Sequence, residues 1–153
     1  FVMAAINTRN VHRSNMLLDY QYGHNFKYDE MMLTGPGELG EATANAVAND
    51  KSLAGDDGPK PGEGPTQEER DNGFYDLMFV GKDGNGKTHI ASVAGSLDPG
   101  YGSTSRMIAE SALCLVENYE NIDGGFYTTA PALGNALIKR LQDNAGLVFK
   151  IEA

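Results

Sequence analysis

Tryptophan is absent from the 153 residues, and cysteine occurs once, at Cys114. A single cysteine excludes an internal disulfide and is typical of a reducing compartment, so we expect a cytoplasmic protein. Histidine is also scarce: His12, His24 and His89 lie far apart, and none belongs to an HxxH or CxxC pattern. Because zinc sites are built from such closely spaced ligands, the sequence predicts no metal site.

Basic residues are few. The 12 Lys and Arg stand against 21 Asp and Glu, which gives a formal net charge of −9. More than half of this excess lies between residues 50 and 76, where eight acids accompany three bases. An acidic surface repels the phosphate backbone of DNA and RNA, and no basic patch with interleaved aromatics occurs, so we expect no nucleic-acid partner.

Long hydrophobic runs are missing as well. The apolar opening at residues 1–6 is too short to span a membrane and lacks the basic region of a signal peptide. Because nothing polar precedes this segment, we expect that the chain was cut from a longer polypeptide. With 41% hydrophobic residues, residues 1–153 are expected to form a single packed domain.

The N-terminal half contains two predicted helices and one predicted strand. Asn7 can cap a helix that continues to about residue 18. Aromatic and charged residues alternate over residues 26–33, which is the period of a half-buried strand. An alanine-rich helix is predicted over about 38–53, and the four Gly and three Pro of residues 55–65 predict a loop.

The next segments predict a capped helix and a hairpin. Thr66 and Glu69 have the spacing of a capping box at the start of a short acidic helix. Strands are predicted over 74–81 and 87–97, on either side of Asp-Gly-Asn-Gly at 83–86. That tetrapeptide supplies the positive-φ residues that a tight hairpin needs.

Apolar residues at helical spacing predict two further helices, over 103–119 and from about 131 to 146, and an amphipathic strand at 147–151. On the first of these helices, Arg106 and Glu110 are expected to pair one turn apart. Only the connection into the last strand has the length of a helical crossover. We therefore expect an α+β fold with a mixed, largely antiparallel sheet and helices packed against it.

A G-x-G-x-x-G motif at residues 35–40 has the spacing of a dinucleotide-binding turn. Three features argue against that interpretation: the preceding segment carries Lys27, Asp29 and Glu30, Pro36 removes one backbone N–H, and no second strand follows to deliver an acid to a ribose. We interpret the motif as a helix entry and expect no cofactor bound by this chain.

No catalytic constellation can be assigned. Cys114 lies within the apolar run 112–116 and is predicted to be a core residue. Asp29 and Glu30 are adjacent, so on a strand they would point to opposite faces. Hydroxyls and backbone amides gather at 95–104, where a helix start favours an anionic or carbonyl ligand, although ordinary turn and cap chemistry explains the same residues.

Three groups of residues, in chain order, are similar to the second half of saccharopine dehydrogenase-like oxidoreductases. They are FVMA at 1–4 with Asn7, RSN at 13–15 and LL at 17–18; DPGY at 98–101 with AESALCL at 109–115; and GG at 124–125 with Thr129, LG at 133–134, LI at 137–138 and RL at 140–141. The branch that resembles trans-acting enoyl reductases of lipid and polyketide pathways is closer than the lysine-pathway enzymes.

The resemblance implies the C-terminal, substrate-binding and dimerising domain of an NAD(P)-dependent oxidoreductase. The dinucleotide would bind to a Rossmann domain upstream in the same polypeptide, so this chain alone would be inactive. The expected partners are that Rossmann domain, a small-molecule or acyl substrate, and a second copy in a homodimer. The resemblance assigns no site residue here; from the residues themselves, the polar helix face with Arg9 and Arg13 and the helix start with Tyr101 and Thr104 supply the candidate substrate-binding residues. The alternative is a free-standing, non-enzymatic α+β domain that binds a ligand or a partner.

Overall fold

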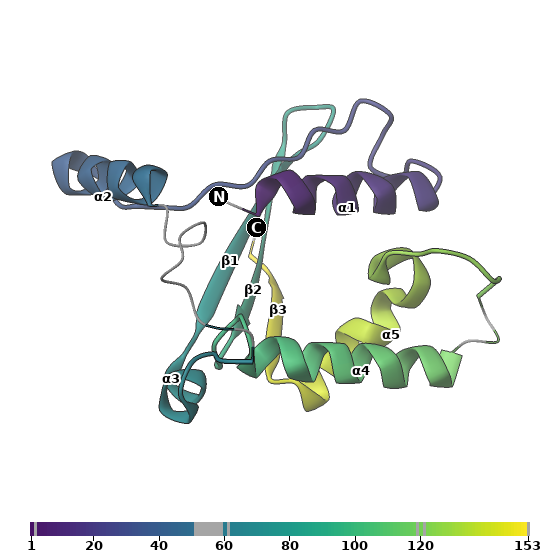
Figure 1. Cartoon of the computed structure of the whole chain (residues 1–153). Coiled ribbons are helices and arrows are strands. Elements are labelled where there is room, and N and C mark those ends of the chain that lie inside the picture. Colours follow the sequence, from purple (N-terminus) through teal and green to yellow (C-terminus); the bar gives the residue numbers. More distant parts are fainter. Residues whose placement is uncertain (2, 51–59, 61, 119, 121, 153) are drawn as a thin grey trace. The chain divides into compact units, whose positions relative to one another are not determined.

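The computed structural model describes residues 1, 3–50, 60, 62–118, 120 and 122–152. The chain divides into two compact units, an N-terminal unit (Phe1–Gly64) and a C-terminal unit (Pro65–Ala153) (Figure 1). No helix in the described part of the chain combines the length and the hydropathy that a membrane crossing needs.

The N-terminal unit contains the helices α1 (Ala4–Leu17) and α2 (Gly37–Asn49). The predicted cap at Asn7 is wrong, because α1 begins at Ala4 and its N-cap position is Met3. Asn7 therefore lies inside the helix, where its side-chain amide donates a hydrogen bond of 3.0 Å to Glu30 Oε2. Residues 51–53 of the second predicted helix, and most of the predicted loop at 55–65, lie outside the described residues.

The strand predicted at residues 26–33 is wrong: this segment pairs with no other strand. The alternation that suggested it is nevertheless real, because Phe26, Tyr28 and Glu30 are partly buried while the residues between them are exposed. The buried side contacts α1, through an edge-on ring contact of Phe26 with His12 at 5.7 Å and through the bond of Glu30 to Asn7. An extended segment packed on a helix thus has the same period as a strand.

This contact places Tyr28 in an unusual environment. Its hydroxyl donates to Glu30 Oε1 at 2.8 Å, and burial, followed by the hydrogen bond and the charge of Glu30, raises the pKa of Tyr28 to about 12. A folded-state pKa above the unfolded value of about 10 contributes stability that is complete below pH 10 and is lost as the pH rises towards 12.

We therefore expect the free energy of unfolding of the chain to fall more steeply between pH 10 and 12 than that of the Tyr28→Phe variant. Urea unfolding of both chains across this range measures the difference. Glu30→Gln, which removes the charge but keeps the shape, should reduce the slope. Identical slopes for the chain and the Tyr28→Phe variant would contradict the assignment.

The described residues of the C-terminal unit form three helices and three strands: α3 (Gln67–Asn72), β1 (Tyr75–Lys82), β2 (Thr88–Gly95), α4 (Gly102–Asn118), α5 (Thr129–Asn144) and β3 (Leu147–Ile151). The capping box is confirmed, since Glu69 N donates to Thr66 Oγ1 at 3.2 Å and Thr66 N donates to Glu69 Oε2 at 2.7 Å. The predicted helices are confirmed within a few residues, although Gly134 kinks α5 (φ 46°, ψ −130°).

The sheet has the strand order β1-β2-β3, and both pairings are antiparallel. The hairpin is confirmed: its register runs from Tyr75 opposite Gly95 to Lys82 opposite Thr88. Asp83 closes the turn, because its Oδ1 accepts the N–H groups of Asn85 and Lys87. Helices packed on an antiparallel sheet confirm the α+β class. The mixed sheet is wrong for the described strands, because the connection through α4 and α5 also leads into an antiparallel pairing, of β3 with β2.

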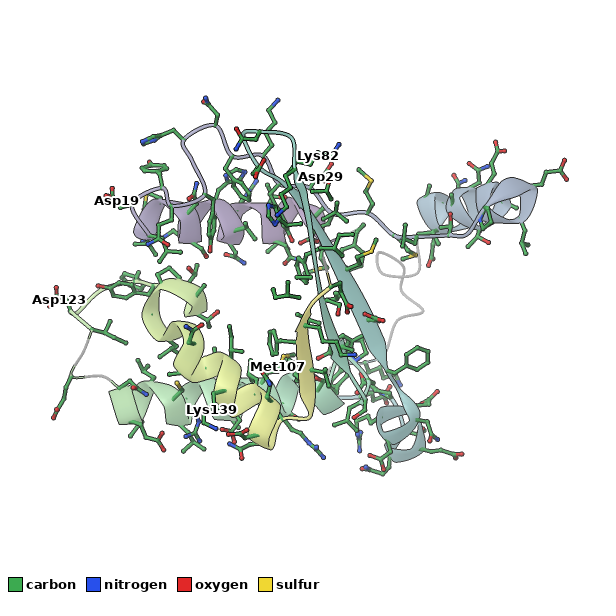
Figure 2. The ribbon with its side chains drawn as sticks, turned by 180° about the vertical axis from the view of Figure 1, so that it is seen from behind. Asp19, Asp29, Lys82, Met107, Asp123 and Lys139 are labelled. Carbon is green, nitrogen blue, oxygen red and sulfur yellow. The ribbon has the colours of Figure 1, made fainter. Side chains whose placement is uncertain are left out.

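The core of the C-terminal unit lies between the sheet, α4 and α5 (Figure 2). Among the described residues, the buried hydrophobic side chains of this core are Cys114, Leu137, Leu141, Ala145 and Leu147. Val93, Met107, Leu133 and Phe149 pack against them. Cys114 is fully buried, which confirms its interpretation as a core residue.

An ion-pair network also joins α4 to α5. Arg140 Nε donates to Glu110 Oε2 at 2.9 Å, and its Nη1 donates to Glu117 Oε2 at 2.6 Å. Asn144 adds a third bond to Glu110 at 3.1 Å. The expected pairing of Glu110 with Arg106 is therefore wrong: Glu110 turns towards the neighbouring helix, where its carboxylate is better shielded from water.

Candidate functional site

The start of α4 is organised by one carboxylate. Asp98 Oδ1 accepts the N–H groups of Gly100 and Tyr101 at 2.9 and 3.0 Å, and Oδ2 accepts that of Gly102. The bond from Gly102, and then those from Tyr101 and Gly100, lower the pKa of Asp98. The free amides at this helix start are thus bound by the chain's own carboxylate, which confirms the turn and cap interpretation of residues 95–104.

Asp98 also ties α4 to the short helix α3. Its backbone N–H donates to the carbonyl of Arg70 at 3.0 Å, and Gly73, just after α3, lies directly against it. Because Pro99 and Gly100 turn the chain at once, the first turn of α4 lies beside α3.

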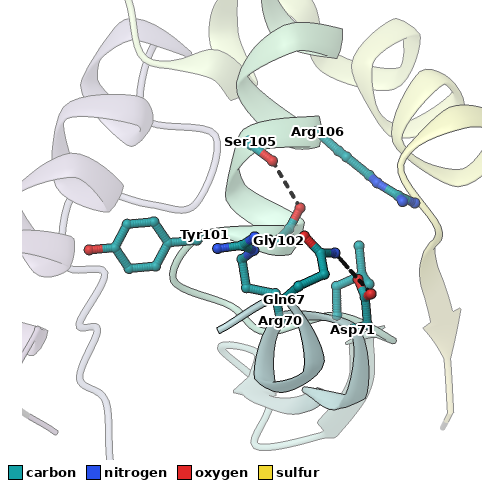
Figure 3. A pocket seen from close by; sticks show the side chains of 8 residues that line it. Gln67, Arg70, Asp71, Tyr101, Gly102, Ser105 and Arg106 are labelled. Atoms are coloured by element: carbon teal, nitrogen blue, oxygen red, sulfur yellow. Dashed lines mark hydrogen bonds between the residues drawn. The ribbon is translucent and has the colours of Figure 1, made fainter. Parts of the chain in front are cut away.

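A shallow depression of about 390 Å³ lies between these two helices (Figure 3). It is lined by side chains from α3, from the turn and from the first turns of α4: Gln67, Arg70, Asp71, Leu97, Tyr101, Gly102, Ser105 and Arg106. Two guanidinium groups and a phenol therefore border one hollow. This composition suits a carbonyl or an anionic group, because guanidinium donates two parallel hydrogen bonds to such oxygens.

The polar side chains of the depression differ in how far their hydrogen-bonding groups are already used within the chain. Arg70 donates to the carbonyl of Pro65 at 2.8 Å and to Gln67 Oε1 at 2.6 Å, and both acceptors are neutral. The amide nitrogen of Gln67 is held by Asp71 at 2.8 Å. Arg106 is exposed, and among the described residues it forms no ion pair. Arg106 is thus the cation of the depression best able to meet a ligand.

The predicted substrate-binding residues fall into two groups. Tyr101 lines the depression and is half exposed, whereas the hydroxyl of Thr104 donates to the carbonyl of Pro99 and is not part of the lining. Arg9 and Arg13 are exposed on α1, in the N-terminal unit. Their predicted role in substrate binding stays a prediction.

Sequence reasoning missed the contribution of α3 to the site. Gln67 and Arg70 lie in a six-residue helix whose only sequence signal is its capping box, and that box says nothing about its neighbour. The one local signal near the site is Asp98-Pro99-Gly100. It predicts a turn but does not indicate which element the turn packs against.

The glycine motif at residues 35–40 does not fit a dinucleotide. No strand precedes it, and α2 starts after Pro36, which makes no side-chain cap. A Cβ on the buried Gly40 would overlap the carbonyl oxygen of Gly35, so this glycine allows α2 to pack closely on the turn before it. The third glycine of a dinucleotide-binding turn has the same packing role, and the missing strand is therefore the feature that argues against the cofactor. In the part of the chain that the structure describes, no three His, Cys, Asp or Glu side chains gather into a metal site.

Fold and site together define an α+β protein with a shallow depression bordered by two arginines. The chain is 35% identical, over 159 aligned residues, to a protein of Mycobacterium tuberculosis (strain ATCC 25618 / H37Rv) provisionally named a trans-acting enoyl reductase. That alignment covers 92% of this chain and 38% of the relative.

Proteins named trans-acting enoyl reductase in Mycobacterium ulcerans (strain Agy99) and Mycobacterium bovis (strain BCG / Pasteur 1173P2) are 32% and 33% identical, each over 97% of this chain and 40% of the relative. The chain is thus homologous to about two fifths of the length of these proteins. No family model and no solved structure matches it.

Proposed function

We propose that this chain is the substrate-binding part of a trans-acting enoyl reductase, and that the parent protein has the two-domain plan of saccharopine dehydrogenase-like oxidoreductases and acts in the cytoplasm. The observation that carries the proposal is the similarity to proteins of that name over 92–97% of the chain. A match that runs from end to end is what a whole domain, rather than a shared motif, would give.

In such a reaction a hydride adds to one carbon of a carbon–carbon double bond and a proton to the other. A nicotinamide dinucleotide would give the hydride and become oxidised. Because residues 35–40 do not fit that cofactor, we assign its binding to a part of the parent protein outside this chain. The isolated chain is then expected to be inactive, and NADPH added to it should produce no binding heat in calorimetry.

The depression between α3 and α4 is the proposed seat for the polar end of an acyl substrate. Arg106 would donate to its carbonyl or anionic group, and Tyr101, on the preceding turn, lines the same depression on its other side (Figure 3). The apolar wall at Leu97 would lie along the first carbons of the chain. These residues bind and orient; the hydride comes from the cofactor.

In the full-length parent, Arg106→Gln should raise the KM for an enoyl thioester about tenfold and leave kcat almost unchanged, because one charge-assisted hydrogen bond contributes roughly 1.5 kcal/mol. The decrease of NADPH absorbance on adding the thioester measures both constants. Lys139→Gln is the matched control: it removes a cation that pairs with Asp143 on the exposed side of α5 and should change neither constant.

Equal KM values for the two variants would show that the depression does not bind the substrate. The reductase proposal would be unaffected by that result. A full-length parent that binds no nicotinamide nucleotide in calorimetry would end the reductase proposal itself. In that case the alternative, a non-enzymatic ligand- or partner-binding α+β domain, would take its place.

A further inference from the structure

The depression between α3 and α4 differs in charge from the chain as a whole. Its lining contains two bases, Arg70 and Arg106, and one acid, Asp71, so its local charge is +1, whereas the chain carries −9. Asp98 lies at the turn beside the lining, but its carboxylate is already bound by three backbone N–H groups. Because salt screens charges beyond about 8 Å, the lining itself, and not the whole chain, decides which ligand is attracted.

Arg70 is a cation that is held in place but not neutralised. Its guanidinium donates to the carbonyl oxygen of Pro65 at 2.8 Å and to Gln67 Oε1 at 2.6 Å. Neither acceptor is charged, and within the described residues Arg70 forms no ion pair. The side chain is also half-buried. Some of its N–H groups are thus used for orientation, while the others and the positive charge remain available to a ligand.

The orientation of Arg70 depends on the side-chain amide of Gln67, which lies between Arg70 and Asp71 (Figure 3). The amide nitrogen of Gln67 is 2.8 Å from Asp71 Oδ1 and 2.9 Å from Oδ2. An ionised carboxylate only accepts hydrogen bonds, so it holds the NH₂ group of Gln67 on the Asp71 side. The carbonyl oxygen of the same amide must then face Arg70. Asp71 therefore orients Gln67, and Gln67 orients Arg70, without a carboxylate bound to the guanidinium.

Arg106 adds an adaptable cation to this fixed one. It is exposed, and its long side chain can turn towards an anion that Arg70 holds. Hydrogen bonds to an ionised acceptor are about twice as strong as bonds between neutral groups, and a guanidinium donates two parallel bonds to a carboxylate or a phosphate. An oxyanion therefore gains more from both arginines than a neutral carbonyl does.

We infer that the depression prefers a ligand that ends in an oxyanion to one that ends in a neutral carbonyl, with Gln67 as the residue that positions Arg70 for this choice. The inference rests on the proposed function, because it narrows the polar end of the acyl substrate to a negatively charged group. An enoyl acid, which ends in a carboxylate, and an enoyl thioester on a phosphate-bearing carrier both meet this requirement. A thioester on an uncharged carrier does not.

Titration of the 153-residue chain with hexanoate, hexyl phosphate and the neutral hexanamide tests the preference, with the NMR shifts of backbone amides as the readout. Hexanoate and hexanamide have nearly the same shape, so the ratio of their dissociation constants isolates the charge. We expect at least one oxyanion to bind about tenfold more tightly than hexanamide, and the tighter of the two distinguishes a carboxylate from a phosphate. Arg70→Gln should lower this preference by about threefold or more.

Gln67→Glu tests the positioning role. It keeps the shape of the side chain but places a carboxylate against Arg70, so the preference for the oxyanion should fall by about threefold or more while hexanamide binds as before. A merely structural role of Gln67 would weaken all three ligands alike. Gln142→Glu is the matched control, because it makes the same change in net charge at an exposed residue of α5 outside the depression. Far-UV circular dichroism verifies that each variant is folded.

A chain that binds the three probes equally, or none of them up to about 100 mM, would overturn the inference. An equal loss of preference in Gln67→Glu and Gln142→Glu would end the positioning role of Gln67. The probes are unreactive and the isolated chain suffices, so these results are independent of hydride transfer. The proposed reductase activity fails by a different result, a full-length parent that binds no nicotinamide nucleotide, and the two failures can therefore be told apart.

Discussion

Leu141→Ala is expected to lower the free energy of unfolding of the C-terminal unit by about 3 kcal/mol, because it empties a buried site that neighbours cannot refill. Leu141 is 8% exposed and lies on α5, where that helix meets the sheet and α4. In the described part of the unit five hydrophobic residues form the buried core, so one leucine is a large part of it. The free energy of unfolding of a small domain is only about 5–15 kcal/mol in total, so this loss should leave the unit marginally folded.

Urea unfolding followed by far-UV circular dichroism measures this effect, with Leu113→Ala as the matched control. Leu113 lies on α4 beside the buried Cys114 but is 49% exposed, so the same deletion of three carbons should cost less than about 1 kcal/mol. If both variants lost the same free energy of unfolding, Leu113 would have to be buried as well, which requires α4 to be rotated about its axis relative to the sheet.

Where a pattern is local, the sequence was sufficient. The hairpin at β1 and β2, the capping box at Thr66, and the helices α4 and α5 all follow from spacings within about twenty residues. In each case the interacting segments are neighbours in the sequence. A tight turn pairs the two strands that it connects, and a capping residue bonds to the helix that it begins.

Where the partner is distant, the sequence could not identify it. The alternation at residues 26–33 correctly reports burial on one side, but it does not say whether a strand or a helix covers that side. Glu110 has a cation one turn away and binds Arg140 of another helix instead. The same limit hid the depression, since Arg70 and Arg106 belong to helices separated by the whole hairpin.

Gly73→Ala is also expected to lower the free energy of unfolding strongly. The cause is steric: there is no room for a Cβ at this position. Gly73 has φ −66° and ψ 155°, an extended conformation that any residue adopts. An added Cβ, however, would lie 2.6 Å from Asp98 Cβ and still closer to the backbone of that residue. A side chain could rotate away from such a contact, but backbone cannot, so α3 and the turn before α4 must separate.

The separation should break the bond from Asp98 N to the carbonyl of Arg70 and disturb the carboxylate that binds Gly100, Tyr101 and Gly102. Overpacking in a well-packed region costs about 1–3 kcal/mol, and we expect the upper end of that range together with loss of the depression. In urea unfolding, Gly84→Ala is the control, because nothing lies within 4 Å of the Cβ it would add. If Gly73→Ala is as stable as Gly84→Ala, α3 is free to move away from α4, and the depression between them is too loosely held to position a substrate.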